Sequence, residues 1–315
     1  MSMPDPQSER SVLEQLAQDL LIERRRSRRW GIFFRLLAVA LVGLGLAVAL
    51  AAFAVREHPC LDQCTALVEI RGELEEGGRA SAQRIVAGMQ AAVKHRGIKG
   101  LILRINSPGG SPVQAGQIYD EVRRLRALHP GIPIHAVVED IAASGGYYVA
   151  AAAEQIFVDK ASIVGSIGVI MDGFGFTGTM DKLGVERRVL TAGRNKALMD
   201  PFAPQDAQQQ AFVQGLLDDI HGQFIAAVRE GRGDRLKESP ELFSGLVWNG
   251  RRAVDLGLAD AFGSVESVAR EVIKAEELVD FTPEDDLTDR FARRLGAVLA
   301  GEFLSTGRRL PAQLR

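Results

Sequence analysis

The feature that most constrains the fold is a regular alternation of short apolar runs with longer amphipathic stretches, which begins at Thr65. The apolar runs have the length and composition of strands, and the amphipathic stretches have the length of helices. The elements expected in the first half are strands at 66–70, 100–105 and 133–138, helices over about 80–96 and 113–128, and a short helix opened by Ser144. Three right-handed βαβ crossovers in a row build a mostly parallel sheet. The sequence therefore predicts an α/β fold.

The second half of the chain continues this alternation without a linker rich in Pro, Gly or Ser, so we expect one domain over residues 65–279. The elements expected there are strands at 155–158, 163–171 and 185–190, a helical piece near 179–183, a long helix over about 204–230, and surface helices at 251–258 and 265–278. In the tail at 280–315, apolar residues recur at helical spacing, which favours an appended amphipathic helix without an assigned role.

A second feature divides the chain, because no residue from Leu36 to Val55 is charged. About 20 such residues, at ~1.5 Å rise per residue, cross the ~30 Å hydrocarbon core of a bilayer. We therefore expect a single transmembrane helix at 31–56. A cleaved signal peptide is the alternative interpretation, because Ala52-Phe53-Ala54 resembles a cleavage site.

The charges on either side of the apolar run predict its orientation. Arginines cluster between residues 24 and 29, whereas Arg56 stands beside Glu57 on the far side. The positive-inside rule then predicts that residues 1–30 are cytoplasmic and that everything beyond residue 56 lies on the extracytoplasmic side of the cell (inner) membrane.

Composition argues against several classes of function. The formal net charge is -2 at pH 7, which gives no reason to expect a nucleic acid as partner. The two cysteines, Cys60 and Cys64, lack a second pair with which to build a metal site. Their spacing fits either a local disulfide or two inert thiols. We expect neither a metal nor a cofactor.

Ser144 follows an expected strand and opens the small-residue stretch at 144–153. A serine on a strand-to-helix turn lies among unpaired backbone N–H groups and the positive end of a helix dipole, where a developing oxyanion is stabilised. An ordinary helix N-cap is the simpler interpretation of a serine in this place. The residue by itself leaves both interpretations open.

A nucleophilic serine needs a base, and the default partner would be a histidine. The histidines are at positions 58, 95, 129, 135 and 221, and none lies beside a turn or a glycine-rich loop, so we expect all of them to be structural. Arginine cannot be deprotonated in proteins, which leaves lysine, provided that burial favours its neutral form. Lys196 follows an expected strand and precedes a loop with apolar neighbours, which makes it the candidate base.

The loop at 106–111, Asn-Ser-Pro-Gly-Gly-Ser, directly follows the strand at 100–105. Ligand sites of parallel sheets lie outside the carboxyl ends of the strands, so this loop and Ser144 could face one cleft. Gly109 and Gly110 allow the backbone to approach a ligand closely, and an N–H group there could form half of an oxyanion hole. A tight turn explains the glycines equally well. The spacing does not match a phosphate-binding loop.

Four stretches taken together resemble the signal peptide peptidase A family, also called protease IV, within the superfamily of Clp-type proteases and crotonases. They are residues 106–111, 143–148, 164–169 and 196–202, and the resemblance extends over about 66–273. It implies that Ser144 is the nucleophile, that Lys196 is the general base, and that the Ser166 hydroxyl orients the lysine. The backbone N–H groups of Gly145 and Gly110 would form the oxyanion hole.

The resemblance also implies a function and partners. Family members are serine endopeptidases that degrade signal peptides left in the membrane after preprotein processing. A single copy of the domain resembles the short members, which assemble as rings of eight and share each Ser/Lys site between neighbouring subunits. Two alternatives stay open: a catalytically silent oligomeric membrane scaffold or regulator, and an acyl-CoA enzyme on a crotonase-like fold.

Overall fold

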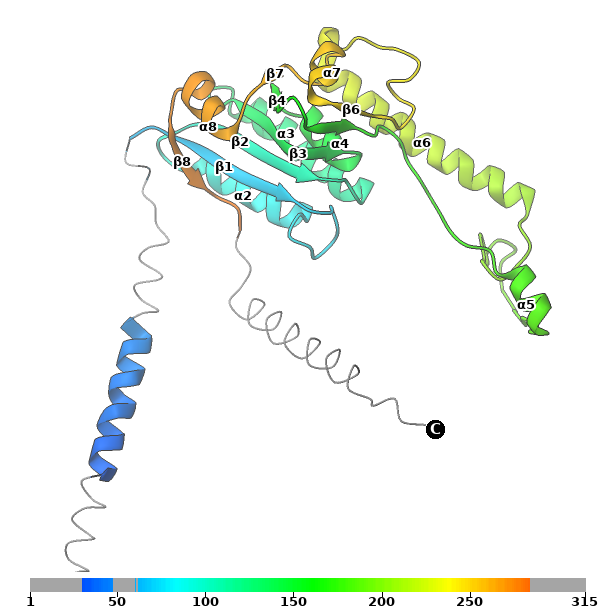
Figure 1. The fold of residues 1–315 in the computed structure, drawn as a ribbon, viewed down its shortest axis with the longest axis horizontal. Helices are drawn as coiled ribbons and strands as arrows, with labels where there is room; N and C mark the ends of the chain where they lie inside the picture. The colour runs from blue at the N-terminus through cyan, green and yellow to red at the C-terminus, as the bar shows by residue number, and fades with distance from the viewer. Residues whose placement is uncertain (1–29, 48–59, 61, 284–315) are drawn as a thin grey trace, which may run out of the picture. The chain divides into compact units, whose positions relative to one another are not determined.

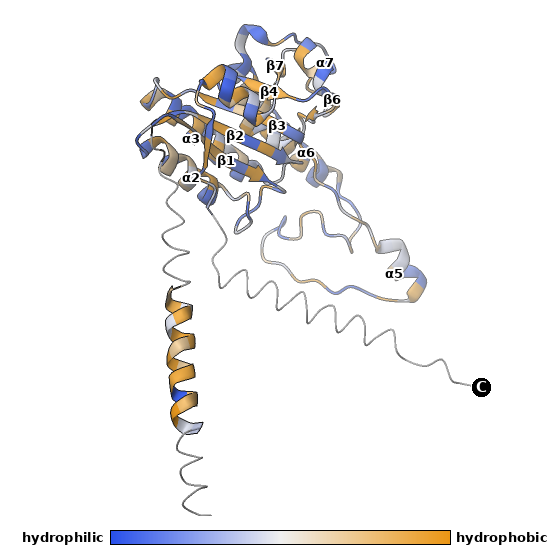
Figure 2. Ribbon diagram, turned by 60° about the vertical axis from the view of Figure 1, so that its left-hand side comes forward, coloured by the Kyte–Doolittle hydropathy of each residue, from blue (hydrophilic) through white to orange (hydrophobic). Residues whose placement is uncertain are grey.

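The computed structural model describes residues 30–47, 60 and 62–283. They belong to two units, residues 1–59 and 60–315. In the first, a helix at Trp30–Ala47 has a mean hydropathy of 2.0 and is long and apolar enough to cross a membrane, a test that a signal sequence also passes. Its apolar composition is visible in Figure 2. The remainder of the predicted span, His58 and the predicted tail helix lie outside the described residues.

A mostly parallel sheet forms the centre of the second unit (Figure 1). Its strands are β1 (Cys64–Arg71), β2 (Ile98–Ser107), β3 (Ile134–Ala143), β4 (Ile156–Val158), β5 (Ile163–Gly165), β6 (Val247–Asn249), β7 (Ala261–Phe262) and β8 (Glu277–Asp280). Their order is β6-β5-β3-β2-β1-β8, with β4 between β3 and β7. Only the β5–β6 pairing is antiparallel. The predicted α/β fold, of the Clp protease and crotonase type, is confirmed.

Helices connect these strands in the order that the sequence predicts. They are α2 (Ala82–Lys94), α3 (Pro112–Leu128), α4 (Gly145–Ala151), α5 (Thr177–Leu183), α6 (Ala207–Arg232), α7 (Gly250–Asp255) and α8 (Val265–Ser267), with a 3-10 turn η1 (Gly233–Arg235) and a π-helical turn η2 (Val268–Ile273). Local sequence fixes where α3 starts, because the Ser111 side chain accepts a hydrogen bond from the Gln114 N–H and Pro112 occupies the first turn.

The central strands are apolar on both faces because helices cover both. Alternate residues of β1, β2 and β3, such as Val68, Leu103 and Val138, belong to the core formed with α2, α3, α4 and α6. The residues between them, such as Ile102 and Val137, belong to a smaller core under α8 and η2. Alternating side chains point to opposite faces of a strand, so a strand between two layers of helices reads as a continuous apolar run.

Three expectations for the second half are wrong in detail. Residues 185–190 form no strand and are exposed. The strand expected at 163–171 ends at Gly165, because the chain turns away at Ser166, where φ is +52°. The helix expected at 265–278 stops at Ile273, because Lys274 adopts the left-handed conformation that commonly ends helices. The residues that follow form β8, which pairs with β1.

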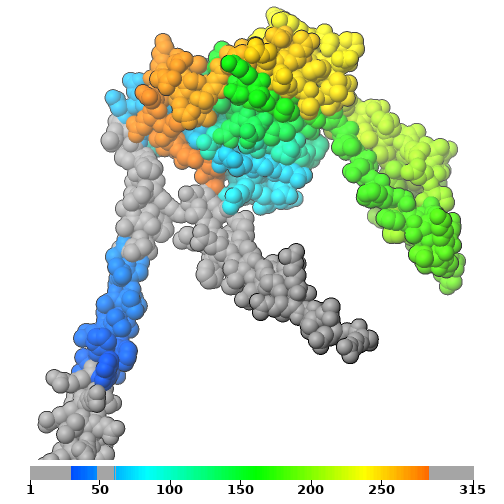
Figure 3. Space-filling model, in the orientation of Figure 1, coloured from blue at the N-terminus to red at the C-terminus, as the bar shows by residue number. Residues whose placement is uncertain are grey.

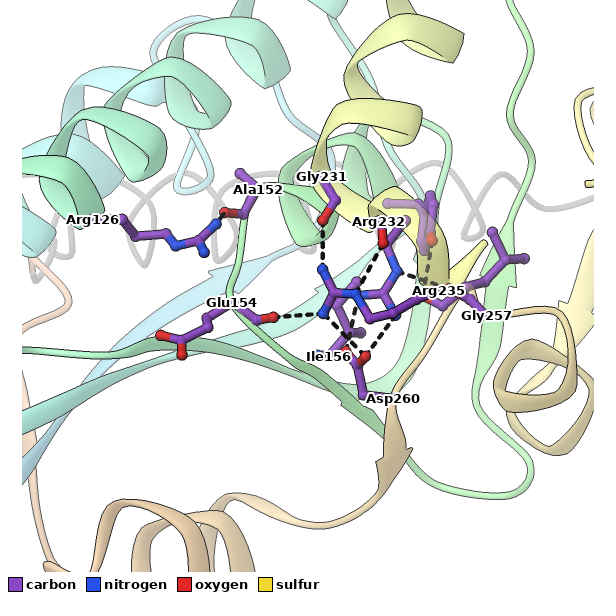
Figure 4. A network of polar contacts seen from close by, with 11 residues as sticks. Arg126, Ala152, Glu154, Ile156, Gly231, Arg232, Arg235, Gly257 and Asp260 are labelled. Atoms are coloured by element: carbon purple, nitrogen blue, oxygen red, sulfur yellow. Dashed lines mark hydrogen bonds and ion pairs between the residues drawn. The ribbon is translucent and has the colours of Figure 1, made fainter. Parts of the chain in front are cut away.

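A buried ion pair fixes the carboxyl end of α6 (Figure 4). The Arg232 side chain is fully buried and donates two hydrogen bonds of 2.9 Å to the carboxylate of Asp260. It donates a third, of 2.8 Å, to the Gly257 carbonyl. Arg235 adds hydrogen bonds to Asp260 and to the Gly231 carbonyl. Asp260 also accepts the Ile156 N–H, so one carboxylate joins the end of α6 to the start of β4.

We expect Asp260→Asn to lower the free energy of unfolding by about 3 kcal/mol, because it leaves the buried Arg232 charge without its partner. Urea unfolding monitored by circular dichroism measures the change. A matched control is Glu186→Gln, which removes a carboxylate that pairs with Arg188 on the surface. Exposed pairs contribute little, so this control should unfold at the urea concentration of the wild type. Equal effects of the two variants would contradict the role given to Asp260.

The same variant should change the response to acid. Burial by itself would raise the pKa of the Asp260 carboxyl, but Arg232, the Ile156 N–H and Arg235 together hold it below its ordinary value. A carboxyl with a lowered pKa stabilises the native state above its unfolded pKa, about 3.9, and this contribution is lost as the pH falls through the folded value. Below about pH 4, the stability of the wild type should therefore fall more steeply than that of Asp260→Asn.

Candidate active site

Ser144 occupies a strained turn between β3 and α4. Its backbone has φ +51° and ψ -124°, a conformation that residues other than glycine rarely adopt. The turn is fixed on both sides, because the Ser144 N–H donates to the Gly165 carbonyl and the Ser144 carbonyl accepts the Tyr148 N–H. The hydroxyl makes no capping hydrogen bond to α4. The N-cap interpretation therefore does not account for this serine, and such strain is typical of functional sites.

The glycine-rich loop lies against this turn. Gly109 and Gly110 have φ values of +108° and +138°, which favour glycine. The loop is held by two hydrogen bonds to Leu74, whose N–H donates to the Gly109 carbonyl and whose carbonyl accepts the Ser111 N–H. A Cβ atom on Gly109 would lie 2.8 Å from the Cβ of Ser144. Only glycine therefore allows the loop to come this close to the serine.

The N–H groups of Gly110 and Gly145 lie close to Ser144. A Cβ atom on Gly145 would lie 3.5 Å from the Gly110 nitrogen, which places the two backbones side by side. Within the described part of the chain, neither N–H donates a backbone hydrogen bond. The structure thus brings together three residues that the sequence singled out, from the ends of β2 and β3.

Ser144 opens into a pocket of about 150 Å³ between α4 and α6. The residues around it are Gly110, Pro112, Ala115, Ser144, Gly145, Tyr148, Gly168, Val169, Ile170, Ile220, Gln223 and Phe224. The rings of Tyr148 and Phe224 lie 4.8 Å apart and form an apolar wall. Burial raises the pKa of the Tyr148 hydroxyl, so this wall stays uncharged at neutral pH. The α6 residues could not be assigned to the site from sequence, since helical periodicity shows an apolar face but not what it contacts.

Ser166 lies next to this turn through its backbone. Gly165, which precedes it, accepts the hydrogen bond from Ser144, and the Ser166 N–H donates to the Leu246 carbonyl at 2.7 Å. Ser166 itself has φ +52°, the second strained serine of the site. Its side chain is half-buried and has no hydrogen-bond partner among residues 62–283.

Lys196 lies apart from Ser144. It belongs to the segment 166–206 between β5 and α6, which contains α5 and extends away from the sheet (Figures 1 and 3). The side chain is exposed, forms no hydrogen bond or ion pair with the described residues, and does not line the Ser144 pocket. One chain therefore brings Ser144, Gly110, Gly145 and the Ser166 backbone together but leaves out the lysine.

The described histidines do not supply a base in its place, since none of them lines the pocket. His135 is buried against the Phe157 ring, and burial lowers its pKa. His221 contacts the Ile167 carbonyl instead. The cysteines form a disulfide between Cys60 and Cys64, at the point where the chain enters β1.

An α/β sheet with a strained serine at the end of a central strand, beside two N–H groups that donate no backbone hydrogen bond within the described chain, is the arrangement typical of serine hydrolases. The sequence pattern of peptidase family S49 matches residues 126–279, a range that includes Ser144, Ser166 and Lys196. The chain belongs to peptidase family S49.

Similarity to known proteins extends beyond this range. The chain is 31% identical over 201 residues to slr0021 of Synechocystis, provisionally named a protease; the match covers 64% of this chain and 70% of that protein. It is 30% identical over 200 residues to a protein of Enterococcus faecium provisionally named signal peptide peptidase SppA, covering 64% of this chain and 58% of that one. It is 38% identical over 254 residues, 79% of this chain, to a Brucella melitensis protein named Na(+)/H(+) antiporter NhaA. The chain spans 33% of the length of that protein.

We expect Gly109→Ala to lower peptidase activity by about 10²-fold or more, because its Cβ would push Ser144 and the Gly145 N–H out of place. Initial rates of peptide hydrolysis measure the loss. Gly116→Ala in α3 is the matched control, since nothing lies within 4 Å of the added methyl group. It should keep full activity and unfold at the same or a higher temperature. A Gly109→Ala protein with normal rates would show that the close approach is not required.

Proposed function

We propose that this protein is a membrane-anchored endopeptidase in which Ser144 is the nucleophile and Lys196 the general base. The observation that carries the proposal is the surroundings of Ser144: a strained serine at a pocket, with the Gly110 and Gly145 backbones side by side next to it. Two such donors stabilise the oxyanion that forms when a serine attacks a carbonyl group. Membership of a peptidase family makes a peptide bond the reacting group.

The proposed reaction has two halves. In the first, Ser144 Oγ attacks the scissile carbonyl carbon as Lys196 takes the hydroxyl proton, and the oxyanion accepts hydrogen bonds from the Gly110 and Gly145 N–H groups. The lysine then gives this proton to the leaving amine, the C–N bond breaks and an acyl-enzyme remains. In the second half, Lys196 activates water, which attacks the ester and releases Ser144. The Ser166 hydroxyl orients the lysine amine.

The lysine of each site comes from a neighbouring copy in this proposal. Lys196 is exposed, and so are several large apolar side chains of the same segment. So many exposed apolar side chains in one segment are unusual on the surface of a monomer. These side chains are Ile170, Met171, Phe174, Leu183, Val185 and Leu190. Contiguous exposed apolar surface marks an interaction site. A second copy that covers this segment would bring a lysine to each serine, as in the ring of eight that the family resemblance implies.

The substrates proposed are apolar peptides, and in particular signal peptide remnants in the membrane. The aromatic wall of Tyr148 and Phe224 suits an apolar side chain next to the scissile bond. The backbone of Gly168–Ile170 lines the pocket, and residues 168–175 use none of their backbone groups in hydrogen bonds within the described chain. An extended peptide can pair with such a segment as an added strand.

The proposed location is the cell membrane, with the protease domain on the extracytoplasmic side. The apolar helix at Trp30–Ala47 and the arginines that precede it support this orientation. The disulfide between Cys60 and Cys64 supports it independently, because disulfides persist in oxidising compartments. Transport, which the name of the Brucella relative mentions, is not carried over, since the match covers a third of that protein.

We expect Ser144→Ala and Lys196→Ala each to reduce peptide hydrolysis by at least about 10⁴-fold, because each removes an atom that takes part in the reaction. Lys182→Ala is the matched control, since Lys182 is an exposed lysine of the same segment. It should keep the wild-type rate. A serine-directed phosphonate probe should label the wild type and not Ser144→Ala. Absence of labelling in the wild type would instead favour a catalytically silent scaffold, and hydrolysis of acyl-CoA without Ser144 would favour a crotonase-like enzyme.

Mixing the two inactive variants tests whether the site is shared. If a neighbouring copy supplies the lysine, mixed assemblies of Ser144→Ala and Lys196→Ala contain sites with both residues, and part of the activity returns. Co-expression of the two variants followed by a peptide hydrolysis assay measures the recovery. Assemblies that stay inactive at every ratio would indicate a dyad within one chain.

A further inference from the structure

The chain that leaves β5 is attached to the body of the domain at three successive residues. The Gly165 carbonyl accepts the Ser144 N–H, and the Ser166 N–H donates to the Leu246 carbonyl. The Ile167 carbonyl is 3.0 Å from Nε2 of His221, which lies on α6. In the described chain, residues 168–175 then make no backbone hydrogen bond before the Phe176 N–H reaches the Pro201 carbonyl. The contact with His221 is thus the last attachment before a free stretch.

This last attachment lies at the pocket. Gly168, Val169 and Ile170, which follow Ile167 directly, form one wall of the Ser144 pocket. Another wall is the turn of α6 that contains Ile220 and Phe224. Because His221 lies on that turn, its hydrogen bond joins the two walls.

No other directional contact in the described chain fixes this wall. Gly168 also lies against Gly245, close enough that an added Cβ would be 3.2 Å from the Gly245 Cα, but the two residues share no hydrogen bond. Glycine at 168 also leaves the backbone free to adopt other conformations. A hydrogen bond to a buried residue such as Ile167 restricts them.

We propose that His221 is a positioning residue, which holds the Gly168–Ile170 wall at the distance from Ser144 that an extended peptide requires. The imidazole donates its Nε2 hydrogen to the Ile167 carbonyl and takes no part in proton transfer. This inference rests on the proposed function, because the wall aligns a peptide only if peptides are the substrates. It separates two properties of the site: Ser144 reacts and two N–H groups stabilise the oxyanion, whereas the wall anchored by His221 aligns the peptide.

Replacement of His221 by Leu removes the donor and introduces an apolar side chain that favours a helix, whereas replacement by Gln keeps an N–H at a similar reach. For peptides of six or more residues, His221→Leu should lower kcat/KM by about tenfold, and His221→Gln should restore most of it. The rate at which a small phosphonate probe labels Ser144 should change less than twofold in His221→Leu, because the probe does not reach the wall. Thermal unfolding of both variants checks the fold.

Hydrogen exchange gives a readout that does not depend on activity. Exchange at the Ser166 amide, one residue from the attachment, should become faster in His221→Leu and return in His221→Gln. Peptide hydrolysis within twofold of the wild type in His221→Leu would overturn the inference. So would equal losses for probe and peptide, or equal defects in the Leu and Gln variants. A wild type that neither cleaves peptides nor reacts with the probe would overturn the proposed function, and the exchange rates would still decide the role of His221.

Discussion

The site depends on the hydrogen bond from the Ser144 N–H to the Gly165 carbonyl. Two strands pair in succession with one edge of β3: β4 along its first half and β5 along its last three residues. The hydrogen bond from Ser144 to Gly165 extends the β3–β5 pairing by one residue past the end of β3. A residue other than glycine in a left-handed conformation costs on the order of 1–3 kcal/mol. The contacts of the turn with β5, α4 and the glycine-rich loop offset that cost, so the reactive residue is held by the sheet itself.

Much of this arrangement could be predicted from the sequence. The strands between two helical layers are continuous apolar runs, and the helices show amphipathic periodicity, so both signals are local. The proximity of Ser144 and Gly110 follows from topology, since the carboxyl ends of neighbouring parallel strands β2 and β3 meet at one edge of the sheet. The strain at Ser144 could not be read from its neighbours in sequence. The contacts that hold this conformation come from β5 and from the loop after β2, which lie elsewhere in the sequence.

The parts that sequence could not predict depend on partners far along the chain. Residues 185–190 have the alternation of a strand, but no described strand lies beside them, and they remain exposed. Residues 277–280 continue an apolar pattern that suits a helix, yet they form strand β8, which pairs with the edge of β1. The α6 wall of the pocket and the contact of His221 with Ile167 join residues more than 50 positions apart. Nothing in local composition specifies such contacts.

The ion pair of Arg232 and Asp260 has a mechanical consequence for the rest of α6. This helix has 26 residues and is therefore about 39 Å long. Its carboxyl end is clamped, its middle borders the pocket, and its amino end carries the segment with Lys196. A tilt of about 5° at the clamp would move the amino end of this helix by roughly 3 Å. Functional groups must be placed to within about 0.5 Å. The rigidity of the Arg232–Asp260 contact therefore determines how accurately α6 can position the segment at its amino end.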